Sequence, residues 1–323
     1  MSEISVRRAG PADRPGVIAL CRETLGWSAD DPDEAFFAWK HDDNVFGPSP
    51  SWVAVADGAV VGVRVFMRWE FLDGEGRSQR AVRAVDTATS PSWQGRGIFN
   101  RLTLGALPEL RREGVDFVFN TPNDKSRPGY LKMGWSRVGR LPVSMRPSRP
   151  GSLSSVVRAR TAAERWSVDV GLGEDPGEVF ADDDEVESLL STVPVHRRIR
   201  TARSAAFLRW RYSFPDLRYR VVPLGDALRD GVVVLRFRRR GAALEAVVCD
   251  QLVPAGARSV VPWSSIASDS GCDYFLALGT GPVAHGFLPV PRNGPVLTWK
   301  PLCRSGVPAV RALDLNLGDV ELF

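Results

Sequence analysis

The chain has 323 residues and a formal net charge of +4, with 44% hydrophobic and 25% charged residues. This composition is typical of a globular protein, and the length exceeds that of one ordinary domain, so we expect two. No run of about 18 apolar residues is present, so we expect no membrane-spanning helix.

The N-terminus and the cysteines argue against a secreted, metal-binding or disulfide-rich protein. The opening MSEISVRRAG lacks the apolar stretch of a secretory signal. The four cysteines are scattered and form no CxxC pair, so we expect neither a metal site nor a disulfide framework in a cytoplasmic protein. The arginines are spread along the chain with carboxylates between them, so we expect neither nucleic acid nor a membrane as a partner.

The first 90 residues predict two helices and a sheet. Residues 4–8 are predicted as an edge strand, and helices are predicted for residues 13–25 and 33–41. Strands 52–56 and 59–69 flank Asp57-Gly58, a strong hairpin signal. Residues 80–88 are then predicted as the next strand.

A glycine-bearing turn, Gln94-Gly95-Arg96-Gly97, follows this strand. Residues 98–112 after it show apolar spacing close to that of a helix. A strand, a glycine turn and a helix together direct backbone N–H groups and a helix N-terminus at an anion. Glycines let a phosphate approach the main chain, and Arg96 adds a positive charge. The sequence therefore predicts a phosphate site here.

A second block sharpens this prediction. Another strand is predicted at residues 115–120, followed by Asn123, then Tyr130 seven residues later, then Gly134-Trp135. Gln94-x-x-Gly97 resembles the pyrophosphate-binding turn of the GNAT acyltransferase superfamily. Asn123 and Tyr130-Leu-Lys-Met-Gly134-Trp135 resemble its second conserved block. The resemblance covers roughly residues 3–145, and its one departure is Phe99, where the family has Gly or Ala.

The resemblance implies an α+β fold with a mostly antiparallel sheet flanked by helices, and an acyl-CoA co-substrate without a metal. It implies Tyr130 as the acid that protonates the leaving thiolate. It also implies a set of residues that bind the acyl-CoA, in which Phe99 either reshapes helix packing or alters how the acyl-CoA lies. These residues are Ala88, Thr89, Gln94, Gly95, Arg96, Gly97, Ile98, Phe99, Asn123 and Ser126.

The second half resembles a degenerate copy of the first. FFAWKH at 36–41 aligns with FLRWRY at 207–212, and each block leads into a strand, a turn and a longer strand. The second half has no Gln-x-x-Gly turn, so we expect it to bind no CoA. The predicted domains are 1–147, with a closing strand pair near 136–145, and 201–323, joined by a linker at 148–200.

The base that takes the proton from the amine has two candidates. His196 follows Pro194 at the predicted junction, where a connector could cross the active-site cleft, and histidine is the natural base near neutral pH. Asp86, on the strand before the glycine turn, is the other candidate, and its alternative role is that of a buried, hydrogen-bonded carboxylate. His41 has Tyr212 as its counterpart, which favours a structural role. A mechanism with no protein base stays open.

The favoured function is acyl transfer from acyl-CoA to an amine, since a thioester is already activated and needs chiefly positioning and modest acid–base help. The two-half organisation is similar to that of enzymes acylating the amino sugar of glycopeptide antibiotics, and of amino-sugar N-acetyltransferases of surface polysaccharides. The alternative from another class is a CoA-binding protein without catalysis. The acceptor, the acyl length and the oligomeric state are not given by the sequence.

Overall fold

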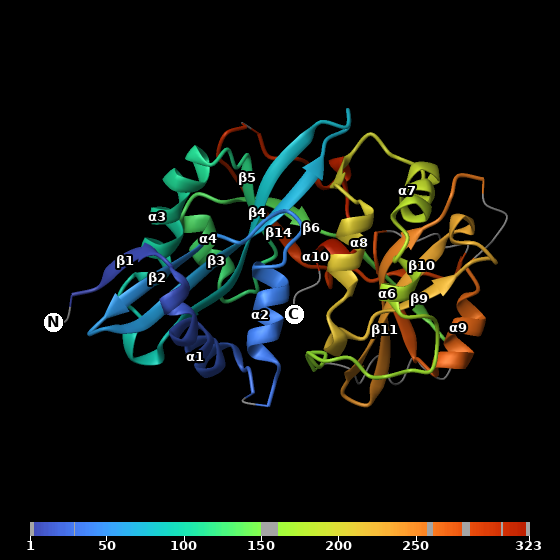
Figure 1. Ribbon diagram of the computed structural model, residues 1–323, viewed down its shortest axis with the longest axis horizontal. Helices are drawn as coiled ribbons and strands as arrows, with labels where there is room; N and C mark the ends of the chain where they lie inside the picture. Colours follow the sequence, from blue (N-terminus) through green and yellow to red (C-terminus); the bar gives the residue numbers. More distant parts are fainter. Residues whose placement is uncertain are drawn as a thin grey trace. The chain divides into compact units, whose positions relative to one another are not determined.

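The computed structural model describes residues 3–28, 30–149, 161–256, 261–279, 285–304 and 306–320. The chain forms two compact units (Figure 1). The first comprises Met1–Gly139 and Pro295–Val310, and the second comprises Arg140–Gly294 and Arg311–Phe323. Each unit has its own sheet and its own hydrophobic core. The predicted α+β class is confirmed.

The sheet of the first unit has the order β1-β2-β3-β4-β5-β14-β6. Neighbouring strands are antiparallel from β1 to β4 and between β5 and β14, whereas β4 and β5 are parallel. The strands are β1 (Ser5–Arg8), β2 (Ser51–Ala56), β3 (Ala59–Leu72), β4 (Ser78–Thr89), β5 (Phe117–Asn120), β14 (Val296–Pro301) and β6 (Ser136–Arg140). The Asp57-Gly58 turn joins β2 to β3, as its sequence predicts.

Helices cover both faces of this sheet. The helices of the first unit are α1 (Arg14–Leu25), α2 (Asp33–His41), α3 (Ile98–Arg112) and α4 (Arg127–Lys132). Apolar residues of α3 and α4 form one buried cluster with strands β2 to β5, and α1, which contacts β3 and β4, contributes nothing to that cluster. Gly62 on β3 lets α3 approach closely, because a Cβ there would lie 2.6 Å from Ile98 Cγ2. Helices α3 and α4 can be followed beside β3 in Figure 1.

A β-bulge interrupts β4 beside the predicted turn. The pairing runs Val63 with Ala88 and then Val65 with Val85, so Arg64 alone faces two residues, Asp86 and Thr87. Asp86 takes a left-handed backbone conformation, with φ of 40°. The bulge redirects the end of β4, which carries the strand into the glycine turn.

The parallel pairing of β4 with β5 is short. It covers only Ala81 with Phe117 through Arg83 with Phe119, although β4 continues to Thr89. Beyond Arg83 the β5-facing edge of β4 has no strand partner among the described residues. Main-chain groups on that edge are therefore available to a ligand.

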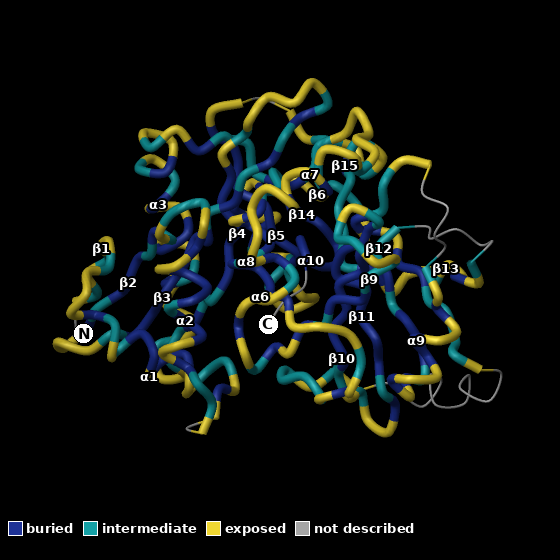
Figure 2. The backbone as a smooth tube through the Cα atoms, turned by 45° about the vertical axis from the view of Figure 1, so that its right-hand side comes forward, coloured by how far each residue is buried: buried dark blue, intermediate teal, exposed yellow. Residues whose placement is uncertain are grey.

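The second unit repeats this sheet pattern. Its order is β9-β10-β11-β12-β7-β13, with β11 and β12 parallel and the other neighbours antiparallel. Its long pair β10–β11 also carries a register shift, between Val234 and Leu235, and both strands are largely buried (Figure 2). The strands are β9 (Arg220–Pro223), β10 (Val232–Arg240), β11 (Ala243–Leu252), β12 (Tyr274–Leu278), β7 (Val143–Pro147) and β13 (Leu288–Pro289).

The remaining elements described in the second unit are five α-helices and a short parallel strand pair. The helices are α6 (Pro176–Val179), α7 (Asp183–Thr192), α8 (Ala205–Tyr212), α9 (Trp263–Ser270) and, near the C-terminal end, α10 (Leu317–Val320), with the strands β8 (Ile199–Thr201) and β15 (Leu313–Asp314).

The structure divides the chain differently from the predicted domains 1–147 and 201–323. The predicted closing strand pair is wrong, because β6 and β7 belong to different sheets. Strand β7 from the first half lies between β12 and β13, and β14 from the second half lies between β5 and β6. Of the predicted linker 148–200, residues 150–160 lie outside the described residues, and α6 and α7 belong to the second unit.

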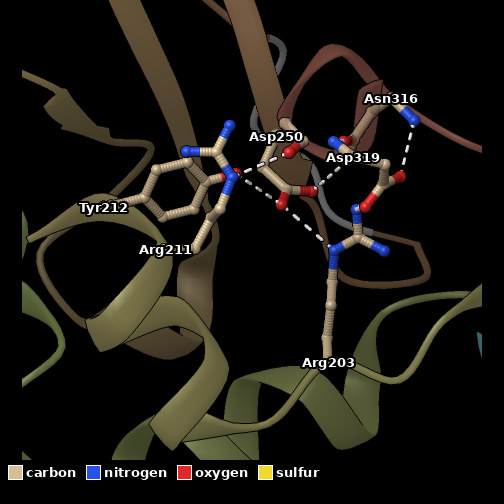
Figure 3. A network of polar contacts seen from close by, with 7 residues as sticks. Arg203, Arg211, Tyr212, Asp250, Asn316 and Asp319 are labelled. Carbon is tan, nitrogen blue, oxygen red and sulfur yellow. Dashed lines mark hydrogen bonds and ion pairs between the residues drawn. The ribbon is translucent and has the colours of Figure 1, made fainter. Parts of the chain in front are cut away.

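A buried polar network holds the C-terminal helix of the second unit (Figure 3). Arg203 Nε donates to Asp250 at 3.0 Å, and its Nη2 donates to both oxygens of Asp319 at 3.0 and 3.1 Å. The Tyr212 hydroxyl and Asn316 Nδ2 also donate to Asp250. Burial raises the pKa of Asp250, an effect that Arg203 opposes and Asp319 reinforces. One arginine thus compensates two buried carboxylates.

Candidate functional site

A pocket of about 380 Å³ lies where α1, the end of β4 and the start of α3 meet. Its walls come from the last turn of α1, the end of β4, the glycine turn and the first turn of α3. The lining residues are Thr24, Leu25, Thr87, Ala88, Thr89, Trp93, Gln94, Gly95, Gly97, Ile98, Phe99 and Asn100.

The glycine turn shapes one wall of this pocket. Gly95 and Gly97 both take the left-handed conformation, with φ of 75° and 72°. Gly97 is the N-cap of α3, and the first intrahelical bond runs from Arg101 N to Gly97 O at 3.0 Å. The N–H groups of the first turn of α3 consequently have no intrahelical acceptor. With the positive end of the helix dipole, they form a site suited to a phosphate.

The open edge of β4 forms a second wall. Thr87, Ala88 and Thr89 line the pocket on the stretch where β4 has no pairing with β5. An extended ligand on this edge could form hydrogen bonds as an added strand does. The pocket thus combines an anion site with a strand-like edge.

The predicted acyl-CoA ligands fall into two groups. Most of them line the pocket: Ala88, Thr89, Gln94, Gly95, Gly97, Ile98 and Phe99. Arg96 does not, and its guanidinium lies 4.5 Å over the Trp93 ring.

Asn123 and Ser126 do not line the pocket either, and they have a local structural role. Asn123 Oδ1 accepts hydrogen bonds from the Lys125 and Ser126 N–H groups and from Ser126 Oγ. These contacts fix the turn that begins α4. Asn123 thus fixes the turn that starts α4, and Tyr130 lies on that helix seven residues later.

Five pocket residues were not predicted from the sequence. Trp93 and Asn100 adjoin the glycine turn, so their proximity was the available signal. Thr24 and Leu25 end α1, about 70 residues earlier in the chain, and only tertiary packing brings them here. Thr87 belongs to the bulge, which the strand pattern did not indicate.

Tyr130 lies on α4 and is only 4% exposed. Its hydroxyl oxygen accepts a hydrogen bond of 2.7 Å from Arg64 Nη1. Tyr130 does not line the pocket, but its ring makes an edge contact with Phe99, which does, at 5.4 Å between centroids. Arg64 lies opposite the bulge of β4, which comes after the end of the β4–β5 pairing. Its hydrogen bond therefore holds the Tyr130 hydroxyl near the bulge.

Phe99, the departure from the family turn, is accommodated by Gly129. A Cβ at position 129 would lie 3.1 Å from the Phe99 ring, so the absence of a side chain there makes room for it. The opposite neighbour is Arg64, whose guanidinium lies 4.9 Å from the ring centroid. Phe99 therefore changes the packing between α3 and α4, which is one of the two expected effects.

Asp86 is buried in an ionic cluster with Lys40 and His41, which lie in the last turn of α2. Its Oδ2 accepts from Lys40 Nζ at 2.7 Å and from His41 Nε2 at 2.6 Å, and Ser49 Oγ lies 3.1 Å from His41 Nδ1. Burial lowers the pKa of His41, so it is neutral near pH 7 and donates its Nε2 proton to Asp86. Burial also opposes ionisation of Asp86, but Lys40 and His41 outweigh it and hold the pKa of that carboxyl well below its ordinary range. Such a carboxylate is a weak base, so the structure favours the buried, hydrogen-bonded role.

The same arrangement recurs in the second unit. Tyr212, the sequence counterpart of His41, ends α8 and donates to Asp250 on β11 at 2.9 Å. His41 likewise ends α2 and bonds to Asp86 on β4. In both units the last residue of a helix thus forms a hydrogen bond to an aspartate on a strand of the sheet.

His196 lies in the second unit between α7 and β8, and its side chain is exposed. Its carbonyl oxygen accepts from Arg198 N at 2.7 Å. His196 stays a predicted base.

Two features are absent from the part of the chain that the structure describes. In the described ranges, no helix is long and apolar enough to cross a bilayer. Over the same residues, no three or more His, Cys, Asp or Glu side chains gather in a way that could hold a metal ion.

Comparisons with known proteins agree with this geometry. Residues 5–138 match the model of the acetyltransferase (GNAT) domain. No curated protein matches the sequence.

Three solved structures are similar over most of the chain. The first is a probable N-acyltransferase from Enterococcus faecalis V583, with a TM-score of 0.66 and 12% identity over 94% of this chain and 73% of that one. A GCN5-related N-acetyltransferase from Anabaena variabilis has a TM-score of 0.64 and 12% identity, covering 93% and 73%. Another from Kribbella flavida has a TM-score of 0.62 and 14% identity, covering 94% and 72%. Residues 5–138 of this chain thus match the acetyltransferase (GNAT) domain in sequence, and the three solved structures share its fold.

Proposed function

We propose that the chain transfers an acyl group from acyl-CoA to an amine. The observation that carries the proposal is the pocket in which the N-terminus of α3 meets the open edge of β4. The first-turn N–H groups suit the pyrophosphate, and the edge of β4 suits the amide-bearing arm of CoA. This arm would lead the thioester from the glycine turn towards the bulge.

The reaction needs two proton transfers. The amine nitrogen attacks the thioester carbonyl, the C–N bond forms, and the C–S bond breaks. Tyr130 gives its proton to the departing sulfur, and the amine proton goes to a base, for which we propose His196. If His196 has no such role, water takes this proton.

The assay that tests the function measures thiol release from acetyl-CoA and longer acyl-CoAs with a panel of amines. We propose amino sugars as the acceptor class, including those of glycopeptide antibiotics and of surface polysaccharides, with simple alkylamines and peptides as comparison. Amine-dependent thiol release supports acyl transfer. Tight acyl-CoA binding without turnover on any amine would favour a CoA-binding protein without catalysis.

Tyr130→Phe should lower kcat about 10- to 1,000-fold with little change in acyl-CoA affinity, because it removes one acid and keeps the ring. Steady-state kinetics and calorimetry measure the two quantities. Tyr274→Phe is the matched control, since Tyr274 lies on β12 of the second unit and donates to Glu245. A Tyr130→Phe enzyme with unchanged kcat, under conditions where chemistry limits the rate, would remove Tyr130 from the mechanism.

His196→Ala should lower kcat and remove the acidic limb of the pH–rate profile, while acyl-CoA binding stays intact. The reason is that a neutral histidine is needed to accept the proton from the amine, and acid converts it to the inactive form. His285→Ala is the matched control for loss of an imidazole. Wild-type turnover with the same acidic limb would show that the base is not His196.

We also propose that the second unit is a degenerate copy of the first that binds no CoA. The matching strand orders, the bulges and the two helix-end contacts to Asp86 and Asp250 support duplication. The connection from β11 to α9 contains no Gln-x-x-Gly turn. Calorimetry should therefore give one acyl-CoA per chain, and two equivalents would contradict this proposal.

A further inference from the structure

Arg64 is a buried cation that has no acidic partner among the residues described. Its side chain is fully buried on β3. Its Nε and Nη2 donate to Thr103 Oγ1 at 3.1 and 2.9 Å, and its Nη1 donates to the Tyr130 hydroxyl at 2.7 Å. Among the described residues, no carboxylate pairs with it. Burying such a charge is costly, and here the three hydrogen bonds and the rings of Phe66, Phe99 and Tyr130 offset that cost in place of a carboxylate.

The direction of the hydrogen bond constrains Tyr130. A guanidinium can only donate, so the tyrosine oxygen is the acceptor. The hydroxyl proton must then point to another acceptor, and it stays available for transfer. The fixed positive charge also stabilises the negative charge that the oxygen acquires once the proton has left.

The neighbouring residues hold Arg64 in this position. Thr103 on α3 accepts hydrogen bonds from Nε and Nη2 of Arg64. The ring of Phe99, which lines the pocket, lies 4.9 Å from the guanidinium. Tyr130 itself contacts the same Phe99 ring. This packing excludes water from the pair, which strengthens the electrostatic interaction.

The second unit offers an internal comparison. Arg236 on β10 is also fully buried. Its Nε donates to Ser167 Oγ at 2.9 Å and its Nη2 donates to the carbonyl oxygen of Arg165. These are structural contacts to a neighbouring segment. In the second unit a tyrosine hydroxyl accepts instead from Arg211 on α8, whereas in the first unit it accepts from Arg64, the residue that faces the bulge.

We propose that Arg64 is a positioning residue for acyl transfer, which orients the Tyr130 proton towards the leaving sulfur and stabilises the oxygen after transfer. The proposal rests on the proposed acyltransferase function and on Tyr130 as its acid.

A double-mutant cycle tests this inference. Arg64→Met should lower kcat about 10- to 100-fold, the range expected for losing a hydrogen bond to a charged group, with acyl-CoA affinity nearly unchanged. In the Tyr130→Phe background the same substitution should change kcat by less than about twofold, because the group through which it acts is absent. Arg64→Lys, which keeps the charge, should restore part of the loss.

The control and the second variant keep the test decisive. Arg236→Met removes the fully buried arginine of β10 in the second unit and should leave kcat of the folded protein unchanged. If Arg64→Met does not fold, Thr103→Val takes its place in the cycle and should lower kcat only when Tyr130 is present. Equal losses in both backgrounds, or no loss in either, would overturn the inference. Because the inference depends on the function, a wild type that transfers to no amine would overturn both, whereas an Arg64→Met enzyme with the wild-type kcat would overturn only the inference.

Discussion

Gly97→Val is expected to abolish acyl-CoA binding, with an increase in Kd of roughly 100-fold or more if two phosphate hydrogen bonds are lost. Gly97 is the N-cap of α3 and has a φ of 72°, so a branched side chain would strain the turn. No heavy atom lies within 4 Å of a Cβ built there, so the new side chain would not clash with the fold. It would instead occupy the pocket where the phosphate should approach. Calorimetry with acyl-CoA measures the effect.

Gly76→Val is the matched control. Gly76 lies in the turn between β3 and β4, has a φ of 81°, and also has open space around its Cβ position. Both variants should lose similar stability, since the backbone strain is the same, and only Gly97→Val should lose affinity. Unchanged affinity in a folded Gly97→Val protein would contradict the placement of CoA.

Arg203→Met is expected to destabilise the second unit by about 3–5 kcal/mol near neutral pH, the cost of leaving a buried ion pair without one partner. Asp250 and Asp319 would then be two buried carboxylates without their shared cation (Figure 3). The loss should appear as a lower midpoint of urea-induced unfolding. Arg218→Met is the control, because its ion pair with Asp169 is exposed and should contribute at most about 1 kcal/mol.

The pH dependence of this loss has a defined sign. The pKa of Asp250 in the folded chain is already above its ordinary value, and loss of Arg203 raises it further. A folded-state pKa above the unfolded one means that the folded chain binds the proton more tightly. The cost of the ionised carboxylate is therefore absent below the unfolded pKa of about 4 and grows as pH rises above it. A destabilisation equal at pH 4 and pH 8 would contradict this account.

The sequence predicted those parts of the site that depend on neighbouring residues. Gln94 to Gly97 and the first turn of α3 form one continuous segment, and the glycine spacing indicated their conformation. The alignment of His41 with Tyr212 also predicted two residues that occupy corresponding places. Arg64 was missed, because an arginine within a strand pattern usually marks a solvent-facing position, and only the packing of α3 and α4 buries it.

The pairing partners of the closing strands were also missed. The segments around β6, β7 and β14 show strand-like patterns, but nothing in a local pattern states which sheet a strand joins. The prediction that neighbours in sequence pair is right for β2 and β3 and wrong for β6 and β7. Pairing between strands that are distant in the sequence was therefore the part of the fold that local patterns did not predict.

The placement of β14 determines when the first unit can be completed during synthesis. Strand β5 ends at Asn120, but its antiparallel partner β14 begins at Val296. At about 5–20 residues per second, the ribosome needs roughly 10–35 s to make the intervening chain. Until then β5 is an exposed edge, the kind of edge that recruits other chains. Expression of the N-terminal half alone should for this reason give an aggregation-prone fragment, and the acetyltransferase domain should become soluble only when residues 295–310 are supplied.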